Sequence, residues 1–258
     1  MTTTTGEILT ERTDAALRVT FNRPDTLNAL TPGMLTGAAE AIETGASDSQ
    51  VRAIMLTGAG RAFSAGADLG DGAGEPTTDT IEAANAVIMA IRRAPKPVVA
   101  AVNGPAVGVG CSFALAADIT IATASAYFLL AFANIGLMPD GGATALIPAT
   151  IGRARALRMA MLAERIPATQ AADWGMIAEA APDDEFDSAV DGLITRLAAG
   201  PTQSYALSKC AINATTLTQL AQALETERTG QAQLFDSKDF DEGVAAFRDK
   251  RPARFTGQ

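Results

Sequence analysis

Two glycine-rich segments are the parts of this sequence best suited to chemistry. They cover residues 60–69 (GRAFSAGADL) and 102–111 (VNGPAVGVGC), and each follows an apolar run typical of a buried strand. Small residues at such turns let a ligand approach the backbone closely. Backbone N–H groups that are free there, or at the start of the next helix, can bind an anion or an oxyanion. The same spacing is also typical of tight connections in which backbone packs on backbone, so both interpretations stay open.

The composition restricts which side chains can move protons. The chain has no histidine, which excludes histidine-based triads, histidine-ligated zinc and imidazole acid–base chemistry. Carboxylates, lysine, tyrosine and cysteine remain. The two cysteines, Cys111 and Cys210, give no disulfide framework and indicate a reducing compartment.

The net charge is −9, from 20 basic and 29 acidic residues. Such a chain is not expected to bind nucleic acid or an anionic membrane, because their phosphates would repel it. An anionic ligand would need its own local basic patch. The first ten residues have no signal-peptide pattern and no apolar run reaches the length of a membrane span, so the sequence predicts a cytoplasmic protein.

A short-chain dehydrogenase is one alternative enzyme class. Gly104, Gly108 and Gly110 match the glycine spacing of its dinucleotide-binding turn, and Tyr205 and Lys209 match its Tyr-x-x-x-Lys pair. That turn normally belongs to the first βαβ unit of the dinucleotide fold. Here it follows residue 103 of the chain, so this alternative remains remote.

Strand-like and helix-like runs alternate along the first three quarters of the chain, which predicts an α/β fold. Thr31 and Pro32 are typical of the start of a helix, as N-cap and first helical residue. After Gly200-Pro201 the pattern becomes helical only, so we expect a core over residues 1–200 and a helical region over 201–258. The expected strands are 17–21, 53–57, 97–102 and 119–122, with 127–128 extended, and the expected helices are 31–44, one ending near 93, 110–117, 203–213, 217–235 and 240–250.

Five segments of the sequence occur in the order and spacing of one known family. They resemble the enoyl-CoA hydratase/isomerase (crotonase) family, and the likeness extends over residues 21–255. The segments are 22–30 (NRPDTLNAL), 63–68 (FSAGAD), 101–110 (AVNGPAVGVG), 136–142 (GLMPDGG) and 242–252 (EGVAAFRDKRP).

The resemblance implies a crotonase-like spiral of ββα units, with a C-terminal helical region that packs subunits into a homotrimer or a hexamer (dimer of trimers). The implied partner is an acyl-CoA thioester, with coenzyme A as part of the substrate and no separate cofactor or metal. The backbone N–H groups of Ala67 and Val109 would then form an oxyanion hole for the thioester oxygen. Each such donor contributes about 3–4 kcal/mol in enzymes where one has been removed.

The resemblance also implies contacts with coenzyme A. Leu27 and Ala65 would lie along its path, and Phe247 and Lys250 would reach its nucleotide end from a neighbouring subunit. Lys250 would supply positive charge for the phosphates. Taken alone, Lys250 is equally typical of a solvated lysine favoured by a helix dipole.

The sequence departs from the family pattern in the substrate pocket. The resemblance places the two glutamates of a hydratase at Ser112 and Phe132, and neither residue is a carboxylate. A serine without an activating partner is not a base near neutral pH, and a phenylalanine side chain can neither accept nor donate a proton. We therefore do not expect efficient hydration by the usual route.

Asp140 stands where several isomerases of the family place a catalytic aspartate. Its neighbours Ile135, Leu137 and Met138 are apolar, and burial among them would raise its pKa and make it a better base. Pro-Asp-Gly is also a turn signal, and an aspartate there commonly caps the following helix.

Other acids lie near the expected site. Asp68 is interpreted as structural, bonding its own loop, whereas Asp71, Glu75 and Glu82 lie in or after a loop over the acyl site and are candidates for a second acid. Three hypotheses follow. Asp140 and the two amides give an isomerase; a binding paralogue without efficient catalysis would have a solvent-facing Asp140; and a weak hydratase is the third.

Overall fold

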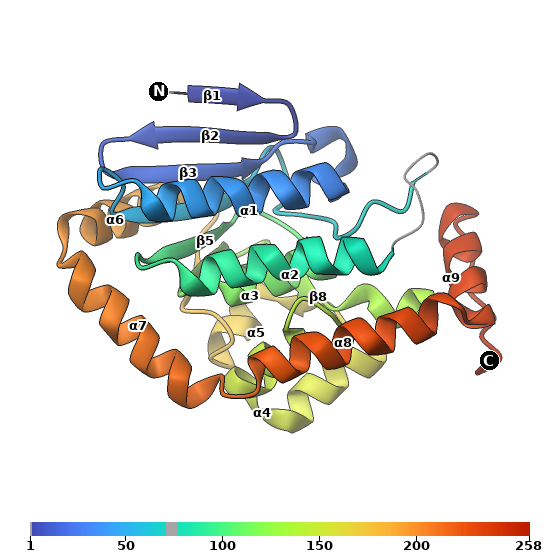
Figure 1. Ribbon diagram of the computed structural model, residues 1–258. Coiled ribbons are helices and arrows are strands. Elements are labelled where there is room, and N and C mark those ends of the chain that lie inside the picture. Colours follow the sequence, from blue (N-terminus) through green and yellow to red (C-terminus); the bar gives the residue numbers. More distant parts are fainter. Residues whose placement is uncertain (1, 71–76) are drawn as a thin grey trace.

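The computed structural model describes residues 2–70 and 77–258, which form a mixed α/β fold (Figure 1). The main sheet of the described residues has the order β1-β2-β3-β4-β5-β7-β10, in which β1, β2 and β3 are antiparallel neighbours and the other pairs are parallel. Its strands are β1 (Thr2–Thr5), β2 (Ile8–Thr13), β3 (Ala16–Phe21), β4 (Ala53–Gly58), β5 (Val98–Val102), β7 (Ile119–Thr123) and β10 (Glu179–Ala181).

The two faces of the central strands pack against different helices, because side chains alternate across a strand. Ile54 and Leu56 of β4 belong to the core beneath α1 (Pro32–Ser47) and α2 (Thr78–Arg93), which lie side by side in Figure 1. Ala53 and Met55 face the opposite way, toward α6 (Phe186–Ala199). Burial on both faces explains why β4 and β5 read as continuous apolar runs.

The predicted start of the first helix is confirmed. Pro32 is its first residue, and the Thr31 hydroxyl accepts a hydrogen bond from the Met34 N–H at 3.1 Å. The sequence pattern missed β1 and β2 because most of β2 is exposed or half-buried and carries polar residues. Its register with β3, from Ile8 opposite Phe21 to Thr13 opposite Ala16, nevertheless extends the sheet by two strands together with β1.

A second, smaller sheet and several helices surround the glycine-rich turns. The sheet has the order β6-β8-β9. These elements are η1 (Pro24–Thr26), β6 (Ala106–Val107), α3 (Val109–Ala116), β8 (Tyr127–Leu129), η2 (Ala131–Ile135), α4 (Ala143–Leu162), β9 (Ile166–Pro167) and α5 (Ala168–Asp173).

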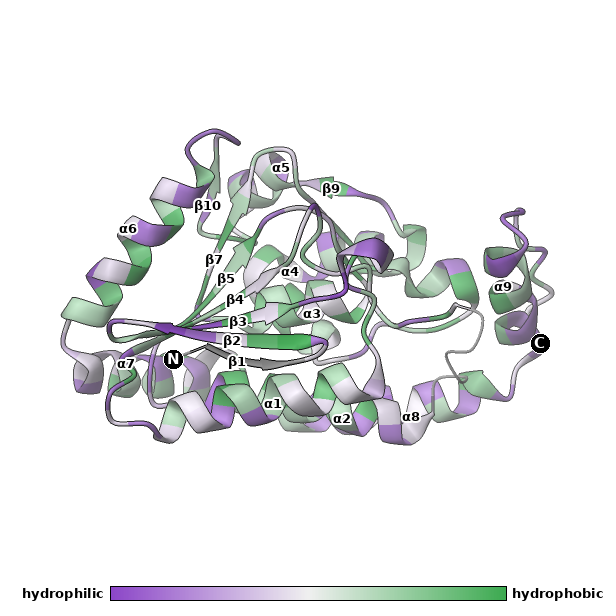
Figure 2. Cartoon of the chain, turned by 90° about the horizontal axis from the view of Figure 1, so that it is seen from above, coloured by the Kyte–Doolittle hydropathy of each residue, from purple (hydrophilic) through white to green (hydrophobic). Residues whose placement is uncertain are grey.

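The predicted helical C-terminal region is confirmed as α7 (Thr202–Thr216), α8 (Leu220–Phe235) and α9 (Lys238–Arg248). Leu220 and Leu224 of α8 belong to the same core as the strands, so this region packs on the rest of the chain. In Figure 2 the peripheral helices α6 and α9 alternate between hydrophobic and hydrophilic residues, as expected for helices with one buried face. Within the described ranges, no helix has the length and apolar character to cross a bilayer.

Candidate active site

The two glycine-rich turns lie directly against each other. Ser64 and Ala106 form a parallel bridge, in which the Val107 N–H donates to the Ser64 carbonyl at 2.9 Å. Gly66 has φ +90°, and a Cβ added to it would lie 3.0 Å from the Val107 carbonyl oxygen. Gly108 has φ +55° and ψ −130°, a region that is practically restricted to glycine. The glycines are therefore required both by conformation and by the close approach of the two turns.

The amides of Ala67 and Val109 have no acceptor among the described residues. The residues before them are bonded: the Gly66 N–H donates to the Ser64 hydroxyl at 3.1 Å, and the Gly108 N–H to the Leu129 carbonyl at 2.8 Å. Val109 is the first residue of α3, where an N–H has no partner within the helix. Two N–H groups at the contact of two turns are thus left to bind a ligand oxygen.

Both residues line a cavity of about 440 Å³, within the range expected for small-molecule sites. Its wall is mostly apolar. Seven of the predicted site residues line it, although they come from segments far apart in the sequence. These are Leu27, Ala65, Ala67, Val109, Phe132, Asp140 and Phe247.

Two predicted site residues lie outside the cavity wall. Ser112 is fully buried, and its hydroxyl donates to the Asp140 backbone carbonyl at 2.7 Å, so it supports the site from behind. Lys250 is exposed and follows the end of α9 at Arg248, with φ +54°, so the expected helix over 240–250 is two residues too long at its C-terminal end and starts two residues too late. It directly follows the C-cap residue Asp249, so it is a solvated lysine at the end of the helix, and its contact with coenzyme A stays a prediction.

Phe247 lines the cavity of its own chain, and the contact with a neighbouring subunit that the resemblance implies stays a prediction. Phe247 reaches its own cavity because α9 packs on η2. A Cβ at Gly243 would come within 2.5 Å of the Ile135 backbone, so glycine is what lets the helix lie this close. Phe247 itself is 57% exposed at the rim of the cavity.

Asp140 is the one carboxylate among the described residues that line the cavity. It is only 9% exposed, so the solvent-facing Asp140 expected of a non-catalytic paralogue is not observed. Its Oδ2 accepts a hydrogen bond from Gln231 Nε2 at 2.8 Å, and its Oδ1 is buried with no partner. Burial raises the pKa of Asp140 to about 7; the bond from Gln231 opposes this rise, and the Glu227 carboxylate adds to it.

The turn sequence alone would predict that the Asp140 side chain caps α4, but it does not. That role belongs to Glu227 of α8, whose carboxylate accepts hydrogen bonds from the N–H groups of Gly142 at 2.7 Å and Thr144 at 2.8 Å. The sequence analysis missed Glu227 and Gln231. The available signal was their spacing of four residues, which places two polar side chains on one face of an expected helix.

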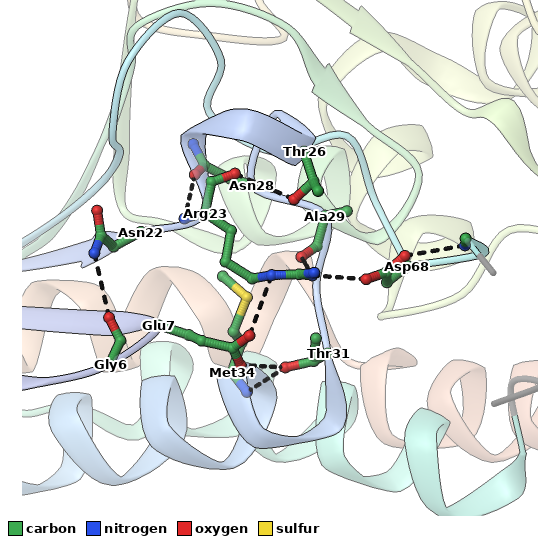
Figure 3. A network of polar contacts seen from close by, with 11 residues as sticks. Gly6, Glu7, Asn22, Arg23, Thr26, Asn28, Ala29, Thr31, Met34 and Asp68 are labelled. Carbon is green, nitrogen blue, oxygen red and sulfur yellow. Dashed lines mark hydrogen bonds and ion pairs between the residues drawn. The ribbon is translucent and has the colours of Figure 1, made fainter. Parts of the chain in front are cut away.

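A network of polar contacts fixes the segment that carries Ala67 (Figure 3). The Arg23 guanidinium donates to the Ala29 carbonyl at 2.8 Å and to Asp68 at 2.7 Å, and it pairs with Glu7 at 3.1 Å. Leu30 and Ala67 form a bridge between the two segments. Arg23 thus ties together the chain on both sides of this bridge.

Asp68 bonds its own loop, as the sequence predicts, by accepting the Gly70 N–H at 3.0 Å. Burial would raise the pKa of Asp68, but Arg23 and Gly70 together hold it below its ordinary value. Glu82 is exposed on α2 and does not line the cavity, while Asp71 and Glu75 lie outside the described residues. In residues 2–70 and 77–258, no cluster of acidic and cysteine side chains is arranged to hold a metal ion.

Comparison with known proteins decides the family. Residues 11–258 match the family model described as Enoyl-CoA hydratase/isomerase. The chain belongs to this family. A probable enoyl-CoA hydratase of Rhodobacter capsulatus is 44% identical over 93% of this chain and 94% of its own length. The 1,2-epoxyphenylacetyl-CoA isomerase of Escherichia coli is 39% identical over 97% and 98%, respectively.

The fold is that of the same family. The crystal structure of an enoyl-CoA hydratase from Mycobacterium avium subsp. paratuberculosis is 47% identical and superposes with a TM-score of 0.92, over 97% of this chain and 99% of that one. The mixed α/β crotonase fold expected from the sequence is thus confirmed. Membership of this family rules out the short-chain dehydrogenase alternative. Lys209, which that alternative paired with Tyr205, forms an ion pair with Asp118 at 2.7 Å.

Proposed function

We propose that this member of the enoyl-CoA hydratase/isomerase family shifts a double bond in an enoyl-CoA, with Asp140 as the acid–base group. The observation that supports this most directly is the buried Asp140, which lines the cavity with one carboxylate oxygen unpartnered. Ala67 and Val109 line the same cavity, and their N–H groups supply the oxyanion hole of the proposal.

The reaction requires one base and no water. The Asp140 carboxylate removes a proton from the carbon between the thioester and the double bond of a 3-enoyl-CoA. The electron pair of that C–H bond forms a double bond to the carbonyl carbon, the π pair of the carbonyl moves to the thioester oxygen, and the two N–H groups stabilise the resulting enolate. When the carbonyl re-forms, the double bond moves one position toward the thioester. The carbon at the distal end of the original double bond takes the proton back from Asp140.

A pKa near neutrality suits both halves of this cycle, because Asp140 must accept a proton and then return it. Two relatives carry isomerase names: the Escherichia coli protein already described and a trans-2-decenoyl-[acyl-carrier-protein] isomerase of Streptococcus mutans, which is 30% identical. Hydration is the second candidate, supported by the name of the Rhodobacter capsulatus relative. It would need a second acid to place the water.

The test compares wild-type protein with Asp140→Asn. Conversion of 3-hexenoyl-CoA to the conjugated isomer is followed by ultraviolet absorbance, and binding of hexanoyl-CoA by calorimetry. We expect Asp140→Asn to lose about 10²–10⁴-fold in kcat, the usual contribution of a positioned acid–base group, with binding retained. Asp191→Asn is the matched control, since Asp191 is exposed and only pairs with Arg18 at 3.9 Å.

Three results would contradict the proposal. Asp140→Asn with wild-type activity would remove the assigned base. Wild-type protein that hydrates 2-hexenoyl-CoA but does not isomerise the 3-enoyl ester would favour the hydratase. Binding of hexanoyl-CoA without turnover of either ester would favour the binding paralogue.

The oligomeric state belongs to the same proposal. We infer that the C-terminal helices assemble the chain into a trimer, or a dimer of trimers. Leu207 and Ile212 of α7 are 74% and 60% exposed, which leaves an apolar surface on this region. Light scattering on purified protein measures the subunit number directly.

A further inference from the structure

Helix α8 holds the side chain of Asp140 in one orientation. Gln231 Nε2 donates to Asp140 Oδ2 at 2.8 Å, and Gln231 is 1% exposed. Its Oε1 accepts the Met138 N–H at 3.4 Å, which fixes the amide with its N–H groups toward Asp140. The Met138 side chain packs against Gly230, where a Cβ would collide with its sulfur.

This contact distinguishes the two oxygens of Asp140. Oδ2 is engaged by Gln231, while Oδ1 is buried without a partner among the described residues. Asp140 lines the cavity, and Gln231 fixes which of its two oxygens stays without a hydrogen bond.

A second residue of α8 acts on the same carboxyl group. Glu227 lies one turn before Gln231 and is fully buried. Its oxygens accept hydrogen bonds from the N–H groups of Gly142 and Thr144 and from the Thr144 hydroxyl. Burial raises the pKa of Glu227, and these three hydrogen bonds oppose the rise by favouring the ionised form. The elements nearest Asp140 otherwise contribute Ser112 of α3 and Phe132 of η2, neither of which is charged.

We propose that Gln231 and Glu227 are positioning residues for the proton transfer, with Gln231 orienting Asp140 and favouring its ionised form, and Glu227 favouring its protonated form. The inference rests on the proposed function, because it assigns the two residues to the step that Asp140 performs. The two roles correspond to the two contacts of α8 with the 138–144 segment, one through Gln231 and one through Glu227. Their effects on Asp140 are opposite in sign.

The opposite signs can be measured in the pH dependence of kcat/KM for 3-hexenoyl-CoA. The base form of Asp140 is required, so activity rises with pH through its pKa. Gln231→Leu removes a donor to the carboxylate, and we expect the midpoint of this rise to move up by about one pH unit. Glu227→Gln removes a neighbouring negative charge, and we expect the midpoint to move down by a similar amount.

Matched controls lie on the same helix. Gln222→Leu and Glu225→Gln make the same chemical changes at exposed positions of α8, and we expect both to keep the wild-type midpoint. Binding of hexanoyl-CoA shows that each variant is folded. Should Glu227→Gln not fold, the carboxyl-carbon NMR titration of Asp140 in Gln231→Leu, assigned against Asp140→Asn, carries the test.

The outcomes separate this inference from the proposed function. If Asp140→Asn retains activity, both are overturned. If Asp140→Asn is inactive but the midpoints of Gln231→Leu and Glu227→Gln coincide with that of wild type, or both move in one direction, the positioning role is overturned and the function stands. Loss of activity in Gln231→Leu at every pH with an unchanged midpoint indicates a structural role and also overturns it.

Discussion

Replacing Val109 with proline would remove one donor of the proposed oxyanion hole and leave the helix intact. Val109 is the first residue of α3, and its N–H has no acceptor within the described part of the chain. Proline is favoured at the first position of a helix, because the N–H it lacks is not used there. The preceding Gly108, at φ +55° and ψ −130°, has the mirror image of the extended conformation that residues before proline prefer, and glycine adopts both hands.

The expected magnitude follows from the chemistry of the site. Loss of one oxyanion donor costs about 10²–10³-fold in kcat, or about 3–4 kcal/mol of transition-state stabilisation. The ground-state thioester carries little charge on its oxygen, so we expect KM to change much less than kcat. The proline ring also changes the side-chain packing at residue 109. The Val109 side chain packs closely against Gly141, where an added Cβ would lie 3.2 Å from the Val109 Cγ2.

The assay is steady-state isomerisation of 3-hexenoyl-CoA, with hexanoyl-CoA binding and thermal unfolding as checks on the fold. Val109→Ala is the matched control: it loses the same side-chain contacts but keeps the N–H, and we expect its kcat to stay within a few-fold of wild type. The reasoning is refuted if Val109→Pro folds and turns over at the wild-type rate. It is also refuted if Val109→Ala loses as much activity as Val109→Pro.

Three further predictions concern stability and support of the site. Between about pH 4 and pH 7 the folded state holds a proton on Asp140 that the unfolded chain has released, so the free energy of unfolding falls by a few kcal/mol as the pH rises through that window. Asp140→Asn should therefore raise the melting temperature more at about pH 8 than at about pH 4. Equal effects at the two pH values would contradict this. Arg23→Ala should lower kcat and stability because Asp68 loses its partner beside Ala67, and Arg23→Lys, which keeps the charge but not the planar fork, should recover only part of each, measured by kinetics and urea unfolding. Asp118→Asn leaves the Lys209 ammonium unpaired in a largely buried site and should cost about 3–5 kcal/mol in urea unfolding with wild-type KM.

Much of the fold was predictable because its signals are local. The apolar runs of β4 and β5 and the Thr31-Pro32 helix start are properties of neighbouring residues, and each appears where the sequence predicts it. Strands β1 and β2 were not predicted, because β1 is a run of threonines and most of β2 is polar and half-buried or exposed, which leaves no apolar pattern. The pairing of β1 with β2, and of β2 with β3, becomes visible only in the structure.

The candidate site was predictable only in part, and for the same physical reason. The turns around Gly66 and Gly108 were predictable, because they adopt backbone conformations that residues other than glycine rarely adopt. Gln231 and Glu227 lie 91 and 87 positions from Asp140 in the sequence. Their spacing of four residues places them on one face of a helix, but it does not say which distant residue that face contacts. Long-range polar contacts become visible only when the packing of α8 is known.

The position of one carboxylate separates the two chemistries that this fold can support. Ser112 stands where the resemblance places a hydratase glutamate, but it is fully buried and its hydroxyl is bonded to the Asp140 carbonyl. A Cβ on Gly141 would lie 3.0 Å from the Ser112 Cβ, so the absence of a side chain at residue 141 lets the turn that carries Asp140 lie directly against Ser112. The residue that would activate water is thus used to fix the backbone of the acid at position 140. In the proposed isomerisation a single acid takes a proton from one substrate carbon and returns it to another, whereas hydration also requires a group that takes a proton from water.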